Sequence, residues 1–361
     1  MYPGGCSQWN NLIVFKRLFS AKQFIAYFQG APLTVNLLIT SRCNLKCHIC
    51  SAKGMYKDVD ELTSRQIKNF LLQISKYQPA LFIGGGEPFM REDIFEILAA
   101  IKRNRLKFGL VTNGTILDYN KIDRLFNLKP EILIFSIYGK EQLHEKITGV
   151  KGLFEKICKN INYAIGKKNG TKIILNCVIN QENYGQLEDV IQLGRRLGVD
   201  LVRFEHLIFL TEKEYMCHKR AWTLNFSNDE IDMTTYIANI DNRDMGAVLS
   251  VEIPRLLSKY ANFVLFKPYL RKDEIKGWYR KGFIIKRDCF FIKHSLFIKH
   301  DGDIIPCQFF SNYKLGNIKK DDLVKVWNGP KRRFFSSKLK KGLFLDVYGV
   351  VNCECDVKKK L

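Results

Sequence analysis

The sequence lacks the features of secreted and membrane-spanning chains. Its first residues, from Met1 to Cys6, show no basic stretch followed by an apolar run and a small-residue cleavage site, so we expect no signal peptide. The longest apolar runs, such as Ala80–Ile83 and Ile132–Phe135, are far shorter than the roughly 18 residues that cross a bilayer. We therefore expect a cytoplasmic protein without a transmembrane segment.

Cysteine is also sparse, with 11 residues in a chain of 361. That number is odd, and it is too low for a small scaffold held by disulfides. In a reducing compartment, clustered cysteines are more often metal ligands or catalytic groups than disulfide partners. The chain is not disordered either, because 46% of its residues are hydrophobic and 12% are aromatic, enough for a large core.

Acidic residues are scarce relative to basic ones. The chain has 36 Asp and Glu residues and 58 Lys and Arg residues, which gives a formal net charge of +22. This excess predicts an acidic partner such as an acidic peptide, a phosphorylated substrate, an anionic membrane surface or nucleic acid. A solvated, lysine-rich surface is the alternative. The basic residues are spread along the chain without a nucleic-acid-binding signature, so we expect no nucleic-acid partner.

Short apolar runs alternate with helical segments over the first half of the chain. Helix signals include Thr63 with Gln66, a capping-box spacing, and Gly198 after a helical segment. The alternation predicts an α/β protein with a parallel sheet, either a partial (β/α)6 TIM-like barrel or an open doubly wound sheet. The expected strands are Leu33–Thr40, Ala80–Gly84, Lys107–Thr112, Ile132–Ile137, Lys172–Ile179 and Leu201–Phe204.

The pattern changes along the chain and predicts four regions. Residues 1–30 form an N-terminal preamble with one amphipathic helix, around Asn11 to Phe28, and residues 31–206 form the barrel core. Residues 207–287 are irregular, aromatic and basic, and we expect a linker that contacts the substrate. Residues 288–361 form a small cysteine-rich α+β domain, in which Asp301-Gly302 marks a hairpin turn.

Three cysteines follow the first expected strand in the pattern C-x3-C-x2-C: Cys43, Cys47 and Cys50. On a parallel barrel this loop lies at the carboxyl ends of the strands, where active sites are built. Three thiolates can hold an iron–sulfur cluster and leave one iron open to a small molecule. A zinc site with His48 or a distant group as fourth ligand is the alternative.

Polar groups also follow the next strands. The segment Gly84–Pro88 comes after the second strand, and its glycines allow the backbone to approach a ligand closely while Glu87 offers an acceptor. Thr112–Gly114 ends the third strand, Ser136 lies in the fourth, and Asn176 lies in the fifth. Each residue alone is compatible with a turn or a cap. Together they predict a ligand across the mouth of the barrel.

These motifs resemble the radical S-adenosylmethionine (SAM) enzymes over roughly residues 33–205. The stretch from Ser136 through Gly139 and His144 to Thr148–Gly152 is similar to the branch with C-terminal SPASM or twitch extensions. The resemblance implies that the reduced cluster donates an electron to the sulfonium of SAM. The resulting 5′-deoxyadenosyl radical then removes a hydrogen atom from the substrate.

The resemblance also assigns roles to residues of this chain. The catalytic cluster is a [4Fe–4S] cluster held by Cys43, Cys47 and Cys50, whose open iron binds the amino and carboxylate groups of SAM. Gly85, Gly86 and Glu87 match the segment at the methionine amino end, and Ser136 and Asn176 match strand positions that contact SAM. The full set expected to bind the cofactor is Gly85, Gly86, Glu87, Pro88, Asn113, Ser136 and Asn176.

A second group of cysteines lies near the other end of the chain: Cys289, Cys307, Cys353 and Cys355. It resembles the shortened SPASM, or twitch, module, which implies one auxiliary [4Fe–4S] cluster. The last pair is C-x-C rather than the more usual C-x2-C, so three ligands with an open iron stay possible. A structural zinc held by the same four cysteines is a further alternative.

The resemblance favours an oxidoreductase or maturase that modifies a peptide or protein by crosslinking, epimerisation or side-chain oxidation. An acidic or phosphorylated substrate would suit the basic chain, and a reductase, flavodoxin or ferredoxin would supply electrons. The alternative enzyme is a radical dehydrogenase or epimerase acting on a sugar or aminocyclitol. A non-catalytic, zinc-stabilised binding protein is a third hypothesis, which leaves the Gly84–Pro88 segment without a role.

Overall fold

The computed structural model describes residues 18–50, 60–226, 232–237, 243–279 and 290–340. Within them, one sheet has the strand order β10-β9-β8-β1-β2-β3-β4-β5-β6-β7. The strands are β1 (Thr34–Leu38), β2 (Ala80–Gly84), β3 (Phe108–Thr112), β4 (Ile132–Ser136), β5 (Lys172–Ile179), β6 (Leu201–His206), β7 (Val264–Lys267), β8 (Ser295–Ile298), β9 (Asp303–Ile305) and β10 (Gly316–Asn317).

Helices connect the strands. The α-helices are α3 (Ala21–Phe28), α4 (Ser64–Ile74), α5 (Ile94–Arg103), α6 (Tyr119–Asn127), α7 (Glu141–Thr148), α8 (Leu153–Lys167), α9 (Leu187–Leu197), α10 (Glu212–Asn225), α11 (Arg243–Lys259), α12 (Lys272–Trp278), α13 (Phe290–His294), α14 (Leu323–Trp327) and α15 (Pro330–Lys340). The described residues also form the short 3-10 helices η2 (Pro88–Met90), η3 (Thr234–Tyr236) and η4 (Gln308–Phe310). In the described part of the chain, no helix has the length and apolarity needed to span a membrane.

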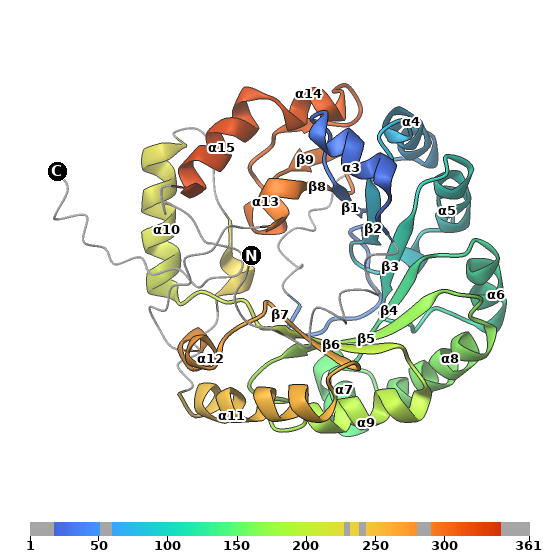
Figure 1. Ribbon diagram of the computed structural model, residues 1–361, viewed down its shortest axis with the longest axis vertical. Coiled ribbons are helices and arrows are strands. Elements are labelled where there is room, and N and C mark those ends of the chain that lie inside the picture. The colour runs from blue at the N-terminus through green and yellow to red at the C-terminus, as the bar shows by residue number, and fades with distance from the viewer. Residues whose placement is uncertain (1–17, 51–59, 227–231, 238–242, 280–289, 341–361) are drawn as a thin grey trace.

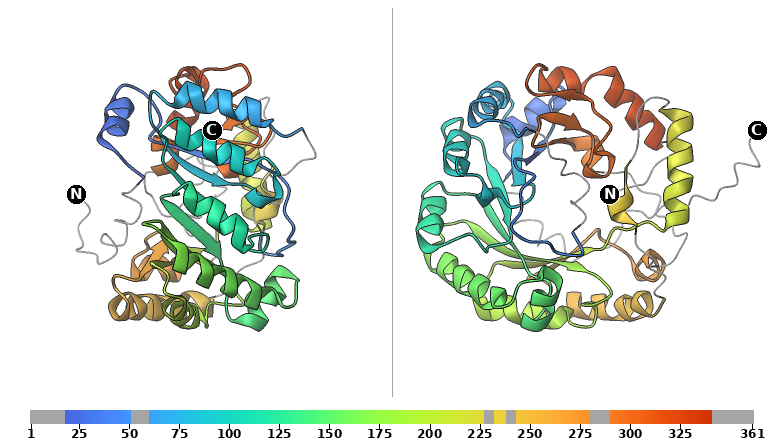
Figure 2. Two further views of the ribbon diagram at one scale, coloured as in Figure 1. Left: turned by 90° about the vertical axis from the view of Figure 1, so that its right-hand side faces the viewer. Right: turned by 180° about the vertical axis from the view of Figure 1, so that it is seen from behind.

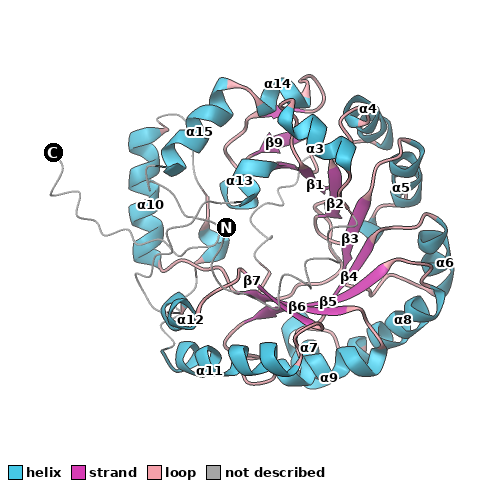
Figure 3. Cartoon of the chain, viewed as in Figure 1, coloured by secondary structure: helices cyan, strands magenta, loops and turns pink. Residues whose placement is uncertain are grey.

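The sheet from β1 to β7 is parallel throughout. It curves around a central axis, and helices α4, α5, α6, α8, α9 and α11 lie on its outer side (Figures 1 and 3). A doubly wound sheet would carry helices on both faces. The structure is therefore a partial barrel, the first of the two architectures that the alternation of strands and helices leaves open.

Local sequence signals fix several helix ends. Thr63 caps α4, with the side chains and backbones of Thr63 and Gln66 paired in both directions. Gly198 ends α9 with a φ of 74°, a left-handed conformation that favours glycine. Both ends are where the sequence predicts them. Helix α3 begins at Ala21, after the cap Ser20, and residues 11–17 of the expected amphipathic helix lie outside the described residues.

Alternate residues of each strand contribute to two separate cores. One face of the sheet packs against the outer helices through residues such as Leu37, Leu110 and Phe204. The other face forms a smaller apolar cluster inside the barrel, built from Leu18, Ala80, Ile132, Ile134, Ile174, Leu201 and Leu265. Side chains in strands alternate between faces, so the inner cluster identifies which strand residues face the barrel interior.

The sheet extends beyond the six expected strands. Strand β7, from the region expected to be irregular, pairs in parallel with β6. On the opposite edge, β8 pairs in parallel with β1, and the expected hairpin of β8 and β9 turns at Gly302 with a φ of 93°. Both views in Figure 2 show the elements that follow β8 beside α3 and β1. The hairpin is thus joined to the barrel by backbone hydrogen bonds.

Candidate active site

The carboxyl ends of β1 to β5 bring the sequence-predicted residues to one rim of the barrel. The loop with the three cysteines follows β1, the segment Gly85–Pro88 follows β2, and Asn113 follows β3. Ser136 is the last residue of β4 and lies in register with Asn176 of β5. The parallel sheet therefore gathers all of these residues although they come from separate parts of the chain.

The three thiols of the first loop lie in different environments. Cys43 is exposed, Cys50 is half-buried and Cys47 is buried. The Cys43 Sγ accepts hydrogen bonds from the backbone N–H of Leu45 at 3.5 Å and from Nδ2 of Asn113 at 3.9 Å. Burial raises the pKa of Cys43, and the nearby Cys50 contributes to the increase.

Tyr138, two residues after β4, lies beside the same loop. Burial raises the pKa of its hydroxyl well above the ordinary value, and Cys47 and Cys50 add to that effect. Its ring stacks on His144, with centroids 5.6 Å apart. Cys50 thus affects the pKa of both Cys43 and Tyr138, and Cys47 affects that of Tyr138.

Three neighbouring thiols of this kind fit an iron–sulfur cluster. Thiolates are the usual ligands of such clusters. The described residues contain no group of three His, Cys, Asp or Glu side chains gathered closely enough for a single metal ion. A [4Fe–4S] cube binds each thiolate through a different iron, so its ligands need not converge on one point.

The two glycines after β2 are required by close backbone packing. Gly85 has a φ of 124°, and a Cβ on Gly86 would lie 2.1 Å from the carbonyl oxygen of Arg42. The N–H of Gly86 donates to Thr40 O at 2.9 Å, and the N–H of Glu87 donates to Arg42 O at 2.8 Å. The segment after β2 therefore lies directly against the residues that lead into Cys43.

Glu87 is fully buried and joins this segment to the end of β3. Its Oε1 accepts hydrogen bonds from the Thr112 hydroxyl at 2.8 Å and the Phe89 N–H at 3.2 Å, and its Oε2 accepts one from the Asn113 N–H at 2.7 Å. Burial raises the pKa of Glu87 to about 7, against the opposing effect of these hydrogen bonds. Both carboxyl oxygens already have protein donors, so the side chain positions neighbouring loops in this structure.

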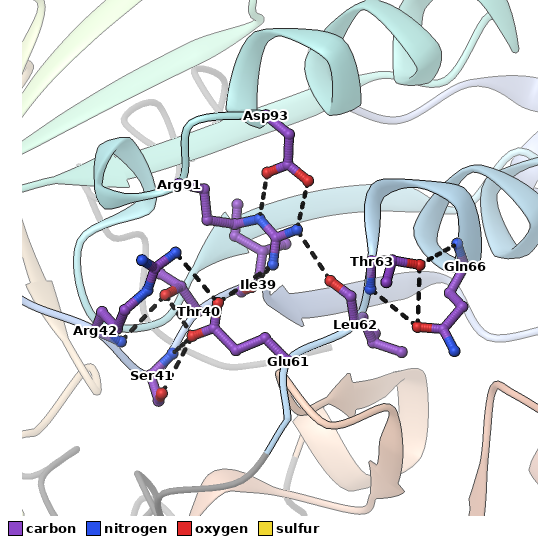
Figure 4. A network of polar contacts seen from close by, with 10 residues as sticks. All are labelled: Ile39, Thr40, Ser41, Arg42, Glu61, Leu62, Thr63, Gln66, Arg91 and Asp93. Carbon is purple, nitrogen blue, oxygen red and sulfur yellow. Dashed lines mark hydrogen bonds and ion pairs between the residues drawn. The ribbon is translucent and has the colours of Figure 1, made fainter.

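Arg91 closes the base of the cysteine loop (Figure 4). Its guanidinium is 5% exposed and donates to the carbonyl oxygens of Ile39 and Leu62, each at 2.9 Å. It also makes a two-point ion pair with Asp93, at 2.7 and 2.8 Å. Ile39 precedes the cysteine loop and Leu62 follows it, so one side chain holds both ends.

Glu61 holds the same loop from its other side (Figure 4). Its Oε1 accepts hydrogen bonds from the Thr40 hydroxyl at 2.7 Å and the Ser41 N–H at 2.8 Å, and its Oε2 lies 3.4 Å from Nη1 of Arg91. Burial raises the pKa of Glu61, but the hydrogen bonds from Thr40 and Ser41, with the charge of Arg42, outweigh burial and lower it. Glu61 thus remains a carboxylate within the network.

The loops after β4 and β5 support the cysteine loop from the opposite side. His48 pairs with Glu182 at 2.5 Å, and the N–H of His48 donates to Ile147 O at 3.3 Å. Nδ2 of Asn183 donates to Tyr138 O at 3.0 Å, which links the two strand ends. In this structure His48 therefore contacts a carboxylate that follows β5.

The second cysteine group is described only in part. Cys307 is buried and precedes η4, in an aromatic cluster that includes Phe310, Tyr313 and Trp222 of α10. The expected partner ligands Cys289, Cys353 and Cys355 lie outside the described residues.

Sequence analysis missed the residues that position the cysteine loop. Arg91 and Asp93 lie two residues apart, shortly after Pro88. This pair of opposite charges is a local signal for an ion pair, and sequence analysis could have used it. Glu61 and Asn183 give no such signal, because their partners are distant in the chain. Tyr138 belongs to a stretch that resembles the family, but its nearness to Cys47 and Cys50 depends on the fold.

We expect Arg91→Met to loosen the cysteine loop. The substitution leaves Asp93 and Glu61 without their guanidinium and removes the bonds to Ile39 and Leu62, at a cost on the order of 3 kcal/mol. The expected results are a lower midpoint of urea unfolding and faster loss of iron to a chelator after anaerobic reconstitution.

The matched control is Lys68→Met, which removes an ion pair with Glu96 on the outer surface of α4 and α5. Exposed pairs contribute little, so iron retention should not change. Equal rates of iron loss in the Arg91 and Lys68 variants would contradict the role of Arg91. Retention restored in Arg91→Lys would show that charge alone is sufficient.

Glu87→Ala should reduce both stability and SAM affinity. It leaves the Thr112 hydroxyl and the Asn113 N–H without an acceptor in a buried place, at about 1–3 kcal/mol for each group. Urea unfolding measures the first effect and calorimetric titration with SAM the second. An unchanged SAM affinity would show that the position of Asn113 does not depend on Glu87.

Two protein-family models match the chain, in separate segments. The radical SAM superfamily model matches residues 37–194, which run from the end of β1 through β5 and include the cysteine loop. The model of an iron–sulfur cluster-binding domain, SPASM, matches residues 289–355. The order of the two matches along the chain is the order that the cysteine groups predict.

Curated relatives extend the similarity over most of the chain. The pre-heme d1 synthase of Dinoroseobacter shibae is 27% identical over 84% of this chain and 75% of its own length. The PqqA peptide cyclase of Gluconobacter oxydans is 26% identical over 82% of this chain and 76% of its own length.

Among solved structures, Streptococcus suis SuiB bound to the precursor peptide SuiA shares the fold with a TM-score of 0.62. It is 18% identical and is matched over 88% of this chain and 70% of its own. With this fold, two matching family models and three cysteines on one loop at the rim of a partial barrel, the chain carries a radical SAM domain followed by a SPASM domain.

Proposed function

We propose that Cys43, Cys47 and Cys50 hold the catalytic [4Fe–4S] cluster and that SAM lies from there across the rim to Ser136 and Asn176. The observation that carries the proposal is the gathering of these residues at the carboxyl ends of β1 to β5. The backbone of Gly85 and Gly86 lies against the cysteine loop, where it can contact the methionine end of SAM. Asn113 already donates to Cys43 and lies between the two groups.

When bound, the cluster and SAM supply the one-electron cleavage of SAM and the abstraction of a hydrogen atom from the substrate. The chain supplies position and exclusion of water. Arg91, Glu61 and Glu87 fix the loops of the cofactor site. The apolar cluster on the inner face of the sheet would exclude water from the site.

The substrate that the comparisons favour is a peptide. The PqqA peptide cyclase is a relative over most of the chain. The SPASM match adds an auxiliary cluster, which would accept an electron from the substrate or organise it. We propose a maturase that crosslinks, epimerises or oxidises a peptide in the cytoplasm. An acidic peptide complements the net charge of +22, and a flavodoxin, ferredoxin or reductase would serve as electron donor.

A tetrapyrrole is the second candidate substrate. The pre-heme d1 synthase relative favours it, being 27% identical over 84% of this chain. A porphyrin and an acidic peptide both carry carboxylates, so the basic chain complements either substrate.

The substrate test uses the reconstituted full chain with SAM and a chemical reductant, without oxygen. Peptides from short reading frames beside the gene are one set of probes, and coproporphyrin III is the other. The proposal predicts that a peptide loses hydrogen or gains solvent deuterium, as read by mass spectrometry. Conversion of the porphyrin with no change in any peptide would contradict the proposed peptide substrate and would show that the substrate is a tetrapyrrole.

Cys307→Ala should lower the iron content by about one cluster, or about four irons per chain, because Cys307 is expected to ligate the auxiliary cluster. Cys158→Ala, in α8 on the outer side of the barrel, is the control and should keep all of the iron. The iron and sulfide contents of each variant are determined, and the electron paramagnetic resonance spectrum of the reduced protein is recorded as a second readout. An unchanged iron content in the Cys307 variant would contradict the assignment of Cys307 as a ligand of the auxiliary cluster.

A further inference from the structure

Strands β6 and β7 carry charged residues on the inner face of the barrel. Leu201 and Leu265 belong to the apolar cluster of that face, whereas Phe204 and Phe266 belong to the core under the helices. Strand alternation therefore places Arg203 and Glu205 on the inner face above Leu201. By the same alternation, Lys267 lies on the inner face above Leu265.

Arg203 is held firmly in this place. Its side chain is 10% exposed, its Nε donates to Oδ1 of Asn176 at 2.6 Å, and its Nη2 lies 3.0 Å from Oε1 of Glu205. Lys267 is in register with Glu205 on the neighbouring strand. Two basic side chains thus lie beside one another on the inner face, next to the carboxylate of Glu205.

Burial inside a barrel penalises the charged form of a basic side chain. The effect is visible at Lys267, where burial and the charge of Arg203 lower the pKa to about 8. A negatively charged ligand group would relieve this cost. A second polar group faces the same interior: the buried Nδ2 of Asn36, on the inner face of β1 beside Phe82, has no hydrogen-bond partner.

The position of Arg203 separates it from the methionine end of SAM. The cysteine loop and Gly86 follow β1 and β2, whereas β6 is four strands away from β2 in the sheet. Neighbouring strands lie about 4.8 Å apart, so four strand spacings along the curved sheet separate β6 from β2, where the segment proposed for the methionine end begins. Asn176 links Arg203 to the other end of the proposed SAM site.

We propose that Arg203, with Lys267 beside it, binds a carboxylate of the substrate inside the barrel, next to the SAM site. This inference rests on the proposed function, because it needs a substrate beside SAM. A guanidinium suits the task, since its planar fork can donate two parallel hydrogen bonds to a carboxylate. The carboxylate belongs either to an acidic residue or C-terminus of a peptide or to a porphyrin side chain.

The test measures equilibrium binding to the reconstituted full chain with SAM bound. One probe pair is coproporphyrin III and its tetramethyl ester, and the other is a glutamate-rich hexapeptide and its glutamine counterpart. We expect at least one carboxylate probe to bind more tightly than its neutral counterpart. The pair that shows the preference identifies the source of the carboxylate.

Variants then locate the binding group. Arg203→Met should weaken binding of the preferred probe by roughly 10- to 100-fold, the range for a lost charged hydrogen bond. Arg203→Lys should retain part of the preference, because the charge remains. Arg196→Met, exposed on α9, should bind the probe as the wild type does.

Two results would overturn the proposal: a wild-type protein that binds neither carboxylate probe in preference to its neutral counterpart, or an Arg203→Met variant that keeps the preference. SAM affinity and iron content of each variant show whether the barrel is intact. Failure of the proposed function would be seen separately, as absence of 5′-deoxyadenosine from the wild type.

Discussion

Parallel pairing from β1 to β7 is the constraint on which the site depends. Because the strands share one direction, the segments that follow β1, β2, β3 and β4 meet at one rim. The sheet supplies this placement only to within a few ångströms. The finer positions come from buried polar contacts, in which Glu87 joins two strand ends and Arg91 joins the two ends of the cysteine loop.

In residues 40–50 and 60–62, the part of the cysteine loop that the structure describes, no helix or strand is formed, and side-chain contacts hold the loop in place. Arg91 and Glu61 join its two ends, Glu182 contacts His48, and Asn113 donates to Cys43. Each contact comes from a different strand end. A cluster site built in this way depends on the whole rim, so a change at one loop is transmitted to the others.

The sequence predicts the parallel sheet, the cysteine loop and the Gly-rich segment well, because periodicity, caps and short motifs are local, but periodicity does not distinguish a barrel from an open doubly wound sheet. It does not predict that β7 extends the sheet or that β8 pairs with β1, since both depend on partners distant in the chain. The side chain of Glu87 shows the same limit. Its motif indicates a ligand contact, but only the fold reveals that Thr112 and Asn113 already occupy its oxygens.

The most direct measurement is anaerobic iron and sulfide content together with reductive cleavage of SAM, for the wild type and for a variant with Cys43, Cys47 and Cys50 all changed to alanine. The account predicts that the variant loses about four irons per chain, one [4Fe–4S] cluster. It also predicts that only the wild type forms 5′-deoxyadenosine. Zinc in place of iron, or 5′-deoxyadenosine formed by the triple variant, would contradict the assignment of these cysteines.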